Sequence, residues 1–248
     1  MKRTLKIILI FLMISALGPL IVFLKGDVDF SSSDYRVMSR ESAQISPSPQ
    51  AHPEALVQAF VARTFNWRGP FAVHSWIAVK PKNADHYTVY EVIGFRLYQG
   101  LSVVSVEKNL PDRYWYGNKP ELILNISGKE AEALIPQIDK AAREYPYTHD
   151  YHYWPGPNSN TFIAMIAKDV PKMQLALPGT AIGKDYLPLG DFFAPAPSGT
   201  GYQFSIGGLF SITLAKIEGL EINIIGLVFG ISPYTRTLKW PGIGNVEF

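Results

Sequence analysis

An uncharged apolar run lies close to the start of the chain. Residues 7–24 are apolar except for Ser15, Gly18 and Pro19. A helix that crosses a hydrocarbon core of about 30 Å needs roughly 17–25 residues, so this run is just long enough. A cleaved signal peptide is the alternative, but the small residues before Pro19 form a poor cleavage site. We therefore predict an N-terminal membrane anchor over residues 1–26.

The charges beside this run predict its orientation. Lys2, Arg3 and Lys6 precede it, which favours a cytoplasmic N-terminus and places the rest of the chain across the membrane. In a bacterium this describes a single-pass inner-membrane protein with its C-terminal domain in the periplasm. Residues 27–52 are rich in Ser and Pro and lack periodicity, which predicts a flexible tether. Residues 53–248 are enough for a single domain with a substantial core.

Hydrophobic periodicity predicts alternating elements in the first part of this domain. The elements are a helix over residues 53–65, strands over 71–80, 87–95 and 121–126, and a helix over 128–145. The two strands before residue 96 are separated by a short turn-forming segment and therefore predict a hairpin. The fold class is α+β, with helices packed on an antiparallel sheet.

The C-terminal third has a different pattern, in which glycines interrupt apolar segments from residue 202 to 231. This predicts a β-rich layer, and Lys216 and Glu221 argue against a second membrane span. Glu218 and Gly219 suggest a two-residue hairpin turn that sets Lys216 opposite Glu221. For residues 224–231 we expect burial in the core, with docking on lipid or a partner as the alternative.

Composition excludes several classes of protein. The chain has 23 Lys and Arg against 21 Asp and Glu, but four basic residues belong to the anchor region, which leaves 19 against 21, or −2, for residues 26–248. A basic patch for nucleic acid is therefore not expected. The chain has no cysteine, which rules out disulfides, thiolate metal sites and a cysteine nucleophile. We predict no cofactor and no metal site.

The segment from Tyr151 to Phe162 combines aromatic residues, a Pro-Gly-Pro turn and residues that favour helix N-caps. Backbone N–H groups without partners at a helix start suit an anion, a polarised carbonyl or an oxyanion. The segment from Gly183 to Asp185 could also hold an anion, although it lacks the spacing of a phosphate loop, and an ordinary turn is the alternative. The predicted ligand-binding residues are Trp154, Asn158, Asn160, Thr161, Lys184 and Asp185.

Three further residues suggest nucleophilic catalysis. In the predicted hairpin, Lys80 lies opposite Tyr87, which brings Glu91 diagonally beside His74 on the same face. Glu91 could then orient the imidazole while His74 removes a proton from Ser159. The structural alternative is that Ser159 caps a helix and His74 is a buried residue bonded to backbone.

The order of a His-bearing strand, a second strand, a helix and a small residue at another helix start resembles the permuted papain-like amidases and acyltransferases, such as the lecithin-retinol acyltransferase group. This chain has Asn158-Ser159 in place of Asn-Cys, so that resemblance implies either a serine variant with its nucleophile at position 159 or a papain-like fold that has lost catalysis. Most of residues 54–245 also resembles a family of uncharacterised bacterial membrane-anchored proteins, a domain of unknown function. The motifs that carry this likeness are Trp67-Arg68-Gly69, the segment from Ala72 to Ala78, the segment from Trp154 to Phe162 and the segment from Ala181 to Tyr186.

Two functions are therefore expected from the sequence. One is an envelope protein that binds a ligand or partner through residues 154–162. The other is a serine-dependent hydrolase or transferase of amide or ester bonds that uses Ser159, His74 and Glu91. The expected partners are the membrane, through the N-terminal helix, and a cell-wall or lipid ligand.

Overall fold

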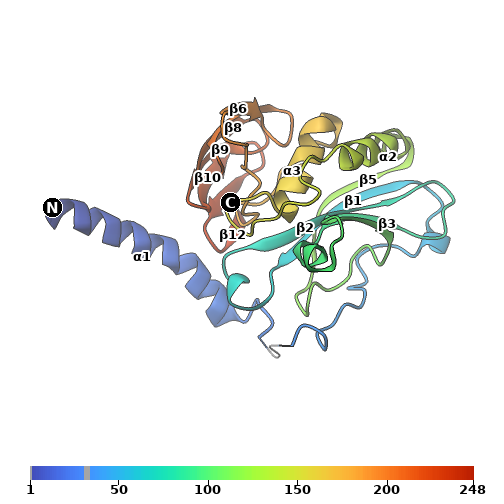
Figure 1. Cartoon of the computed structure of the whole chain (residues 1–248), viewed down its shortest axis with the longest axis horizontal. Helices are drawn as coiled ribbons and strands as arrows, with labels where there is room; N and C mark the ends of the chain where they lie inside the picture. Colours follow the sequence, from blue (N-terminus) through green and yellow to red (C-terminus); the bar gives the residue numbers. More distant parts are fainter. Residues whose placement is uncertain (1, 31–33) are drawn as a thin grey trace.

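The computed structural model describes residues 2–30 and 34–248. Helix α1, Lys2–Lys25, projects from the rest of the molecule in Figure 1. Among the described residues, Arg3–Lys25 is the one helix long and apolar enough to cross a membrane. The N-terminal helix is thus consistent with a single-pass membrane anchor.

A five-stranded antiparallel sheet forms the centre of the domain, in the order β4-β3-β2-β1-β5. Its strands are β1 Leu56–Arg63, β2 Val73–Lys80, β3 Thr88–Val92, β4 Val104–Lys108 and β5 Glu121–Ser127. Helices α2, Gly128–Arg143, and α3, Ser159–Asp169, contact strands of this sheet and one another. Short 3-10 helices lie at Pro49–Ala51, Asn66–Arg68, Gly94–Gln99 and Pro171–Met173. The α+β class is confirmed.

The helix expected over residues 53–65 is wrong, because this segment forms the strand β1. Strand β1 pairs with β2 along one edge and with β5 along the other. Both of its faces are buried: Val57 and Val61 pack under the helices, and Phe60 packs on the opposite side. Ala and Gln are good helix formers, but helix propensity is a weak preference, and burial on two faces outweighs it here.

The predicted hairpin and its register are confirmed. Ile77 lies opposite Tyr90 and Val79 opposite Thr88, the pairing that follows from Lys80 opposite Tyr87. The second strand ends at Val92, and Gly94–Gln99 turns into a 3-10 helix instead of continuing to residue 95. The third predicted strand and the helix after it are β5 and α2.

Part of the expected tether is fixed to the domain. The backbone N–H groups of Ile45 and Ser46 donate to the Asp112 carboxylate at 2.5 and 2.9 Å. The Ser46 hydroxyl group donates to Gln58 Oε1 at 2.8 Å. Ile45 also packs against the cluster that contains Phe60. This segment therefore packs on the face of the sheet opposite α2 and α3.

A second, seven-stranded antiparallel sheet follows, in which each strand pairs with the next in the sequence. Its strands are β6 Phe193–Pro195, β7 Gly201–Ile206, β8 Phe210–Ala215, β9 Gly219–Ile224, β10 Leu227–Ser232, β11 Thr237–Trp240 and β12 Gly244–Glu247. The sheet lies beside α3 in Figure 1. The β-rich C-terminal layer is therefore confirmed.

The turn between β8 and β9 differs from the expectation. Ala215 pairs with Gly219, so the turn has three residues and Thr213, not Lys216, lies opposite Glu221. Gly219 has φ +76°, a left-handed conformation that glycine adopts easily and that suits the end of a three-residue turn. Lys216 instead lies over the ring of Tyr234, with Nζ 4.3 Å from the ring centroid.

In the seven-stranded sheet, polar residues face inward and apolar residues face outward, which is the reverse of the usual arrangement. Along β9 the polar Glu221 and Asn223 are buried, whereas the apolar Leu220 and Ile222 are exposed. In β10, Val228 is buried but Ile231 is exposed. The expectation that residues 224–231 belong to the core is thus correct for only one side of the strand.

Candidate functional site

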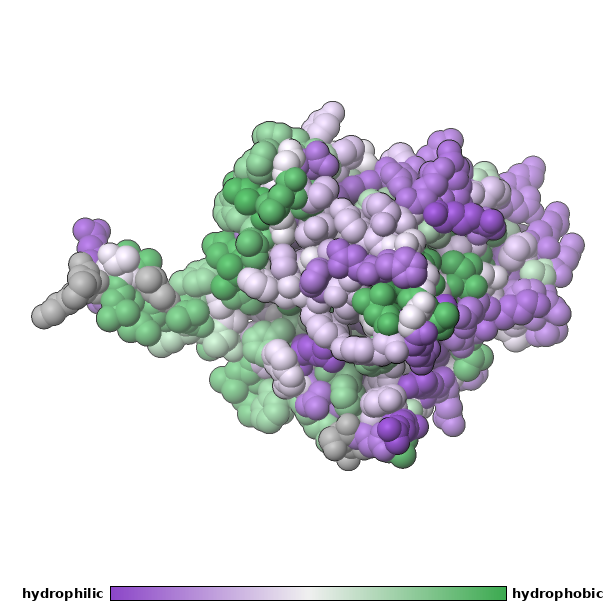
Figure 2. All heavy atoms as spheres, viewed as in Figure 1, coloured by the Kyte–Doolittle hydropathy of each residue, from purple (hydrophilic) through white to green (hydrophobic). Residues whose placement is uncertain are grey.

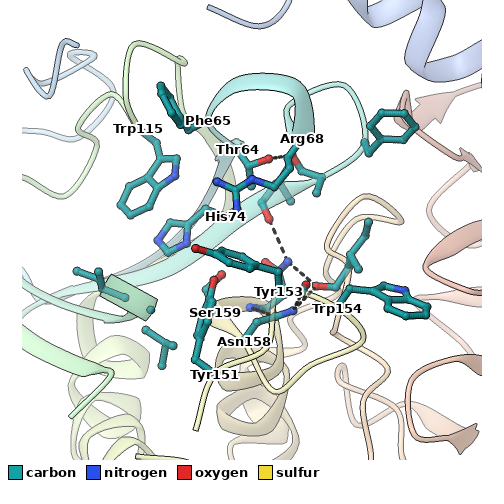
Figure 3. A pocket seen from close by; sticks show the side chains of 18 of the residues that line it. Thr64, Phe65, Arg68, His74, Trp115, Tyr151, Tyr153, Trp154, Asn158 and Ser159 are labelled. Carbon is teal, nitrogen blue, oxygen red and sulfur yellow. Dashed lines mark hydrogen bonds between the residues drawn. The ribbon is translucent and has the colours of Figure 1, made fainter. Parts of the chain in front are cut away.

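A cavity of about 330 Å³ opens where the start of α3 meets β2 and the seven-stranded sheet. Its walls are largely aromatic (Figure 3). The aromatic lining residues include Phe65, Trp115, Tyr116, Tyr151, Tyr153 and Trp154. Polar side chains reach it from three segments: Arg68 from a 3-10 helix, His74 from β2, and Ser159 from α3. Concave sites with apolar walls and a few polar groups are typical of ligand pockets.

The start of α3 is held by Asn158, which is the helix N-cap. Asn158 Oδ1 accepts hydrogen bonds from the N–H groups of Asn160, at 2.9 Å, and Thr161, at 3.2 Å. The Thr161 hydroxyl in turn accepts from the N–H of Asn158 at 3.1 Å, which completes a capping box. Ser159 therefore is not the cap. Its hydroxyl group has no hydrogen bond among the described residues, and it lines the cavity.

Asn160 fixes α3 against the strand that carries His74. Its Nδ2 donates to the carbonyl of Val73 at 3.0 Å, and its Oδ1 accepts from the Ser75 hydroxyl at 2.9 Å. Val73 and Ser75 are the two neighbours of His74 in β2. These contacts therefore bring Ser159 and His74 to the same cavity, as Figure 3 shows.

His74 is bonded to the carboxylate that its register predicts. His74 Nε2 lies 3.1 Å from Glu91 Oε2, and both side chains are nearly buried. A carboxylate only accepts hydrogen bonds, so Nε2 is the donor and Nδ1 of the neutral ring is the acceptor. No hydrogen bond joins His74 to Ser159 in the described structure.

Arg113 holds the other side of Glu91. Its Nη2 lies 2.6 Å from each carboxylate oxygen of Glu91, and its guanidinium group lies over the rings of Trp76 and Trp115. Arg113 Nη1 is buried without a hydrogen bond, and the two indole faces offset part of that cost. The ring of Trp115 also stacks on His74, with centroids 3.6 Å apart and planes 9° apart. These contacts hold the imidazole in one orientation.

The electrostatics of this group keep His74 neutral. Burial lowers the pKa of His74 below 6.5, and the hydrogen bond to Glu91 opposes this only in part. Burial alone would raise the pKa of Glu91. The hydrogen bond from His74 and the charge of Arg113 outweigh it and hold the pKa of Glu91 below 4.5. At neutral pH the group therefore contains a neutral imidazole, a carboxylate and a guanidinium ion.

The structure distributes the residues named from the sequence over three places. Trp154, Asn158, Asn160, Ser159 and His74 line the cavity. Glu91 lies behind His74, and the Thr161 hydroxyl is occupied by the capping box and by the carbonyl of Gly183, to which it donates at 2.8 Å. Trp154 itself is fixed by Nε1, which donates to the Ile225 carbonyl at 2.9 Å.

Lys184 and Asp185 do not line the cavity. They lie in a buried ion cluster on the inner face of the seven-stranded sheet. Lys184 Nζ contacts Asp185 Oδ1 at 2.8 Å and also Glu221, which pairs with Lys239 as well. Burial would lower the pKa of Lys184, but the charges of Asp185 and Glu221 outweigh it and raise the pKa above its ordinary value. The expected anion is thus replaced by carboxylates of the chain itself.

Two arginines of the site were missed from the sequence. Arg68 lies in the motif Trp67-Arg68-Gly69, which carries the family likeness but was given no role in the site, although a basic residue between an aromatic residue and a glycine was visible there. Arg113 comes from the segment between β4 and β5, and no local pattern links it to Glu91. Among the described residues, no group of three or more metal-ligating side chains is found.

The fold and the cavity together define an α+β protein with an apolar N-terminal helix and a polar pair, His74 and Ser159, in an aromatic pocket. Residues 54–186, more than half of the chain, match the family described as Protein of unknown function (DUF3750), and the chain belongs to that family. Comparison with curated proteins and with solved structures gave no significant match. The family match ends at Tyr186, before the seven-stranded sheet begins.

Proposed function

We propose that this protein is a membrane-anchored binding protein for an amphipathic ligand with an acidic headgroup, held in the cavity at the start of α3. One observation carries the proposal: an aromatic cavity of about 330 Å³ contains a guanidinium group, that of Arg68, which forms no ion pair with a carboxylate of residues 2–30 or 34–248. That volume is within the range of pockets that hold small organic molecules, roughly 300–1,000 Å³.

Arg68 supplies the charge for the headgroup. Its guanidinium carbon lies 4.5 Å from the centroid of the Tyr153 ring. The ion pairs among the described residues do not include Arg68. A guanidinium group forms two parallel hydrogen bonds with a carboxylate or phosphate group. The aromatic walls then contact the apolar part of the ligand. Helix α1 keeps the cavity near the lipid bilayer, which contains amphipathic molecules.

The test is the binding of a dansyl-labelled fatty acid and of its neutral amide to the full chain in lipid nanodiscs, followed by energy transfer from tryptophan. Arg68→Gln removes a charged hydrogen bond worth about 1.5–3 kcal/mol, so affinity for the acid falls by roughly 10-fold to 150-fold. Affinity for the amide stays unchanged. Arg143→Gln is the matched control, since Arg143 is exposed on α2 beside Asp139.

A second variant tests the cavity independently of charge. Ala72 lines the cavity and is half-buried, so Ala72→Phe fills space there without touching the capping box. This variant should lose binding of both the acid and the amide. Unchanged binding in both Ala72→Phe and Arg68→Gln would refute the proposal.

A second candidate function is acyl transfer by Ser159. The observation that favours it is that Asn158 is the cap, which leaves the Ser159 hydroxyl free beside a histidine bonded to Glu91. The resemblance of the sequence to permuted papain-like enzymes also implies a nucleophile at this position. A serine depends on its base for reactivity, because its hydroxyl is only weakly acidic.

The chemistry of this candidate follows from three groups. Nδ1 of the neutral His74 takes the hydroxyl proton as Ser159 Oγ attacks the carbonyl carbon of an ester or amide. The N–H of Ser159 can donate to the developing oxyanion, since the N–H groups of Asn160 and Thr161 are taken by Asn158. His74 then gives its proton to the leaving group, and water or an alcohol repeats the steps to release the acyl group.

A fluorophosphonate probe distinguishes this candidate from binding alone. Labelling of the full chain in detergent should be lost in Ser159→Ala and in His74→Gln if Ser159 is a nucleophile. Ser127→Ala is the matched control, because Ser127 also stands at a helix start and makes no capping bond through its side chain. A folded wild-type protein that takes no label, while it still binds the fatty acid, contradicts acyl transfer and leaves binding as the function.

A further inference from the structure

The outward face of the seven-stranded sheet is apolar across its whole width. Its outward residues form three rows that follow the strand pairing. The first row is Tyr202, Leu214, Leu220, Ile231, Leu238 and Val246; the second is Phe204, Ile212, Ile222, Phe229 and Trp240; the third is Ile206, Phe210, Ile224 and Leu227. We call these residues the outward apolar face. All of them are exposed or half-buried, and none is charged.

The inner face of the same strands explains why the apolar side is not turned inward. Gln203, Thr213, Glu221 and Lys239 lie in one buried row, and Glu221 pairs with Lys184 and Lys239. A shift of one residue in register would expose this ion cluster and bury the apolar rows. The buried ion cluster therefore determines that the apolar face of the sheet points outward. Large exposed apolar patches mark interaction surfaces.

Helix α1 lies against this face and continues it. Phe11 packs on Phe229 with ring centroids 6.0 Å apart, and Phe229 packs on Trp240 at 5.3 Å. Farther along α1, a Cβ at Gly18 would lie 1.8 Å from the carbonyl oxygen of Pro241, so the helix touches the end of β11 closely there. Figure 2 shows hydrophobic residues over α1 and this sheet, and hydrophilic residues gathered on the side of α2.

These contacts place the outward apolar face beside the part of the chain that enters the bilayer, because Phe11 and Gly18 both belong to the apolar run of α1. The backbone groups of inner strands are paired within the sheet, so their face can contact lipid without unpaired N–H groups.

We propose that the outward apolar face docks on the lipid bilayer that α1 enters, so that the domain lies against the membrane on its seven-stranded sheet. Tyr202 and Trp240 are the aromatic residues that suit the boundary between headgroups and hydrocarbon. Leu227 belongs both to this face and to the lining of the cavity, so docking sets the cavity beside the lipid. That last step rests on the proposed ligand, whereas the docking itself does not.

The experiment uses the absence of native cysteine, which allows single spin labels on the full chain. Labels at Leu214→Cys and Ile222→Cys report the outward apolar face, and Lys82→Cys in the exposed loop after β2 is the control. In lipid vesicles the face labels should be several-fold more accessible to oxygen than to a nickel chelate, relative to Lys82→Cys. Ligand binding plays no part in this readout, so it stands or fails apart from the proposed function.

Two outcomes would overturn the docking. Access of the nickel chelate to the face labels equal to that at Lys82→Cys would mean that the face is in water. Protection from both reagents, together with disulfide cross-linking between chains through Ile222→Cys, would mean that a second copy covers the face. Near-native circular dichroism of each labelled variant establishes that the label reports the folded protein.

Discussion

Replacing Arg113 by methionine removes the guanidinium group that forms an ion pair with Glu91. Glu91 then keeps the single hydrogen bond from His74, at 3.1 Å, and remains nearly buried. Methionine retains much of the side-chain volume beside Trp76 and Trp115. The change therefore acts mainly through an uncompensated carboxylate.

The expected loss of stability follows from burial. Breaking a buried ion pair by removing one partner costs about 3–5 kcal/mol, because the other charge is left without compensation. The Arg113 and Glu91 side chains are 7% and 4% exposed, so this range applies. Arg143→Met is the matched control: Arg143 is exposed, its partner Asp139 is half-buried at i−4 on α2, and this pair should contribute below about 0.5 kcal/mol.

The pH dependence gives a sharper test. In the wild type, the pKa of His74 is lowered below 6.5, so the unfolded chain binds this proton first as pH falls. Stability then decreases below pH 6.5, by at most about 1.4 kcal/mol per pH unit. In Arg113→Met, the guanidinium charge that lowers the pKa of both His74 and Glu91 is gone, so the folded pair binds a proton more readily than in the wild type. The stability of the variant should therefore fall less than that of the wild type as pH decreases.

Urea unfolding of the full chain in detergent, followed by circular dichroism between pH 5.5 and 8, measures both effects. The reasoning predicts a difference between variant and wild type that shrinks as pH falls. A loss below 1 kcal/mol, or a loss that is the same at every pH, would show that Arg113 does not compensate the charge of Glu91.

Three further predictions concern the start of α3 and the ion cluster. Asn158→Ala should destabilise the chain by about 2 kcal/mol because it removes the cap, whereas Ser159→Ala should change stability little; equal losses in urea unfolding would make Ser159 a structural residue. Gly183→Ala should also destabilise it, since φ is +97° and a Cβ would lie 2.3 Å from the Asn158 side chain; a neutral result in thermal unfolding contradicts that contact. Lys184→Met should cost about 3–5 kcal/mol because Glu221 loses a buried partner, and a cost below 1 kcal/mol would show that Lys239 suffices.

The site could be predicted from the sequence where local geometry sets it. The pairing of His74 with Glu91 follows from the hairpin register, because a short turn determines which residues share a face. The start of α3 follows from the run of capping residues. Arg113 could not be predicted, because its contact with Glu91 joins two segments that no local pattern relates.

The fold could be predicted least well in two places: a strand that is buried on both faces, and a sheet whose polar residues face inward. Strand β1 mixes residues that suit a helix with residues that suit a strand, and its place between β2 and β5 makes it a strand. The seven-stranded sheet has clear alternation, but alternation alone does not say which side faces inward. The buried pairing of Glu221 with Lys184 decides this, and it joins the sheet to a loop 37 residues earlier.

Photoaffinity labelling tests the central claim, that the cavity at the start of α3 holds an amphipathic ligand. A fatty acid with a diazirine group would be irradiated with the full chain in lipid vesicles, and the cross-linked residues mapped by mass spectrometry. The account predicts cross-links within residues 64–74 and 151–159 of the wild type that are absent from Ala72→Phe. Cross-links confined to α1 and the outward apolar face, in the same pattern for both proteins, would contradict it.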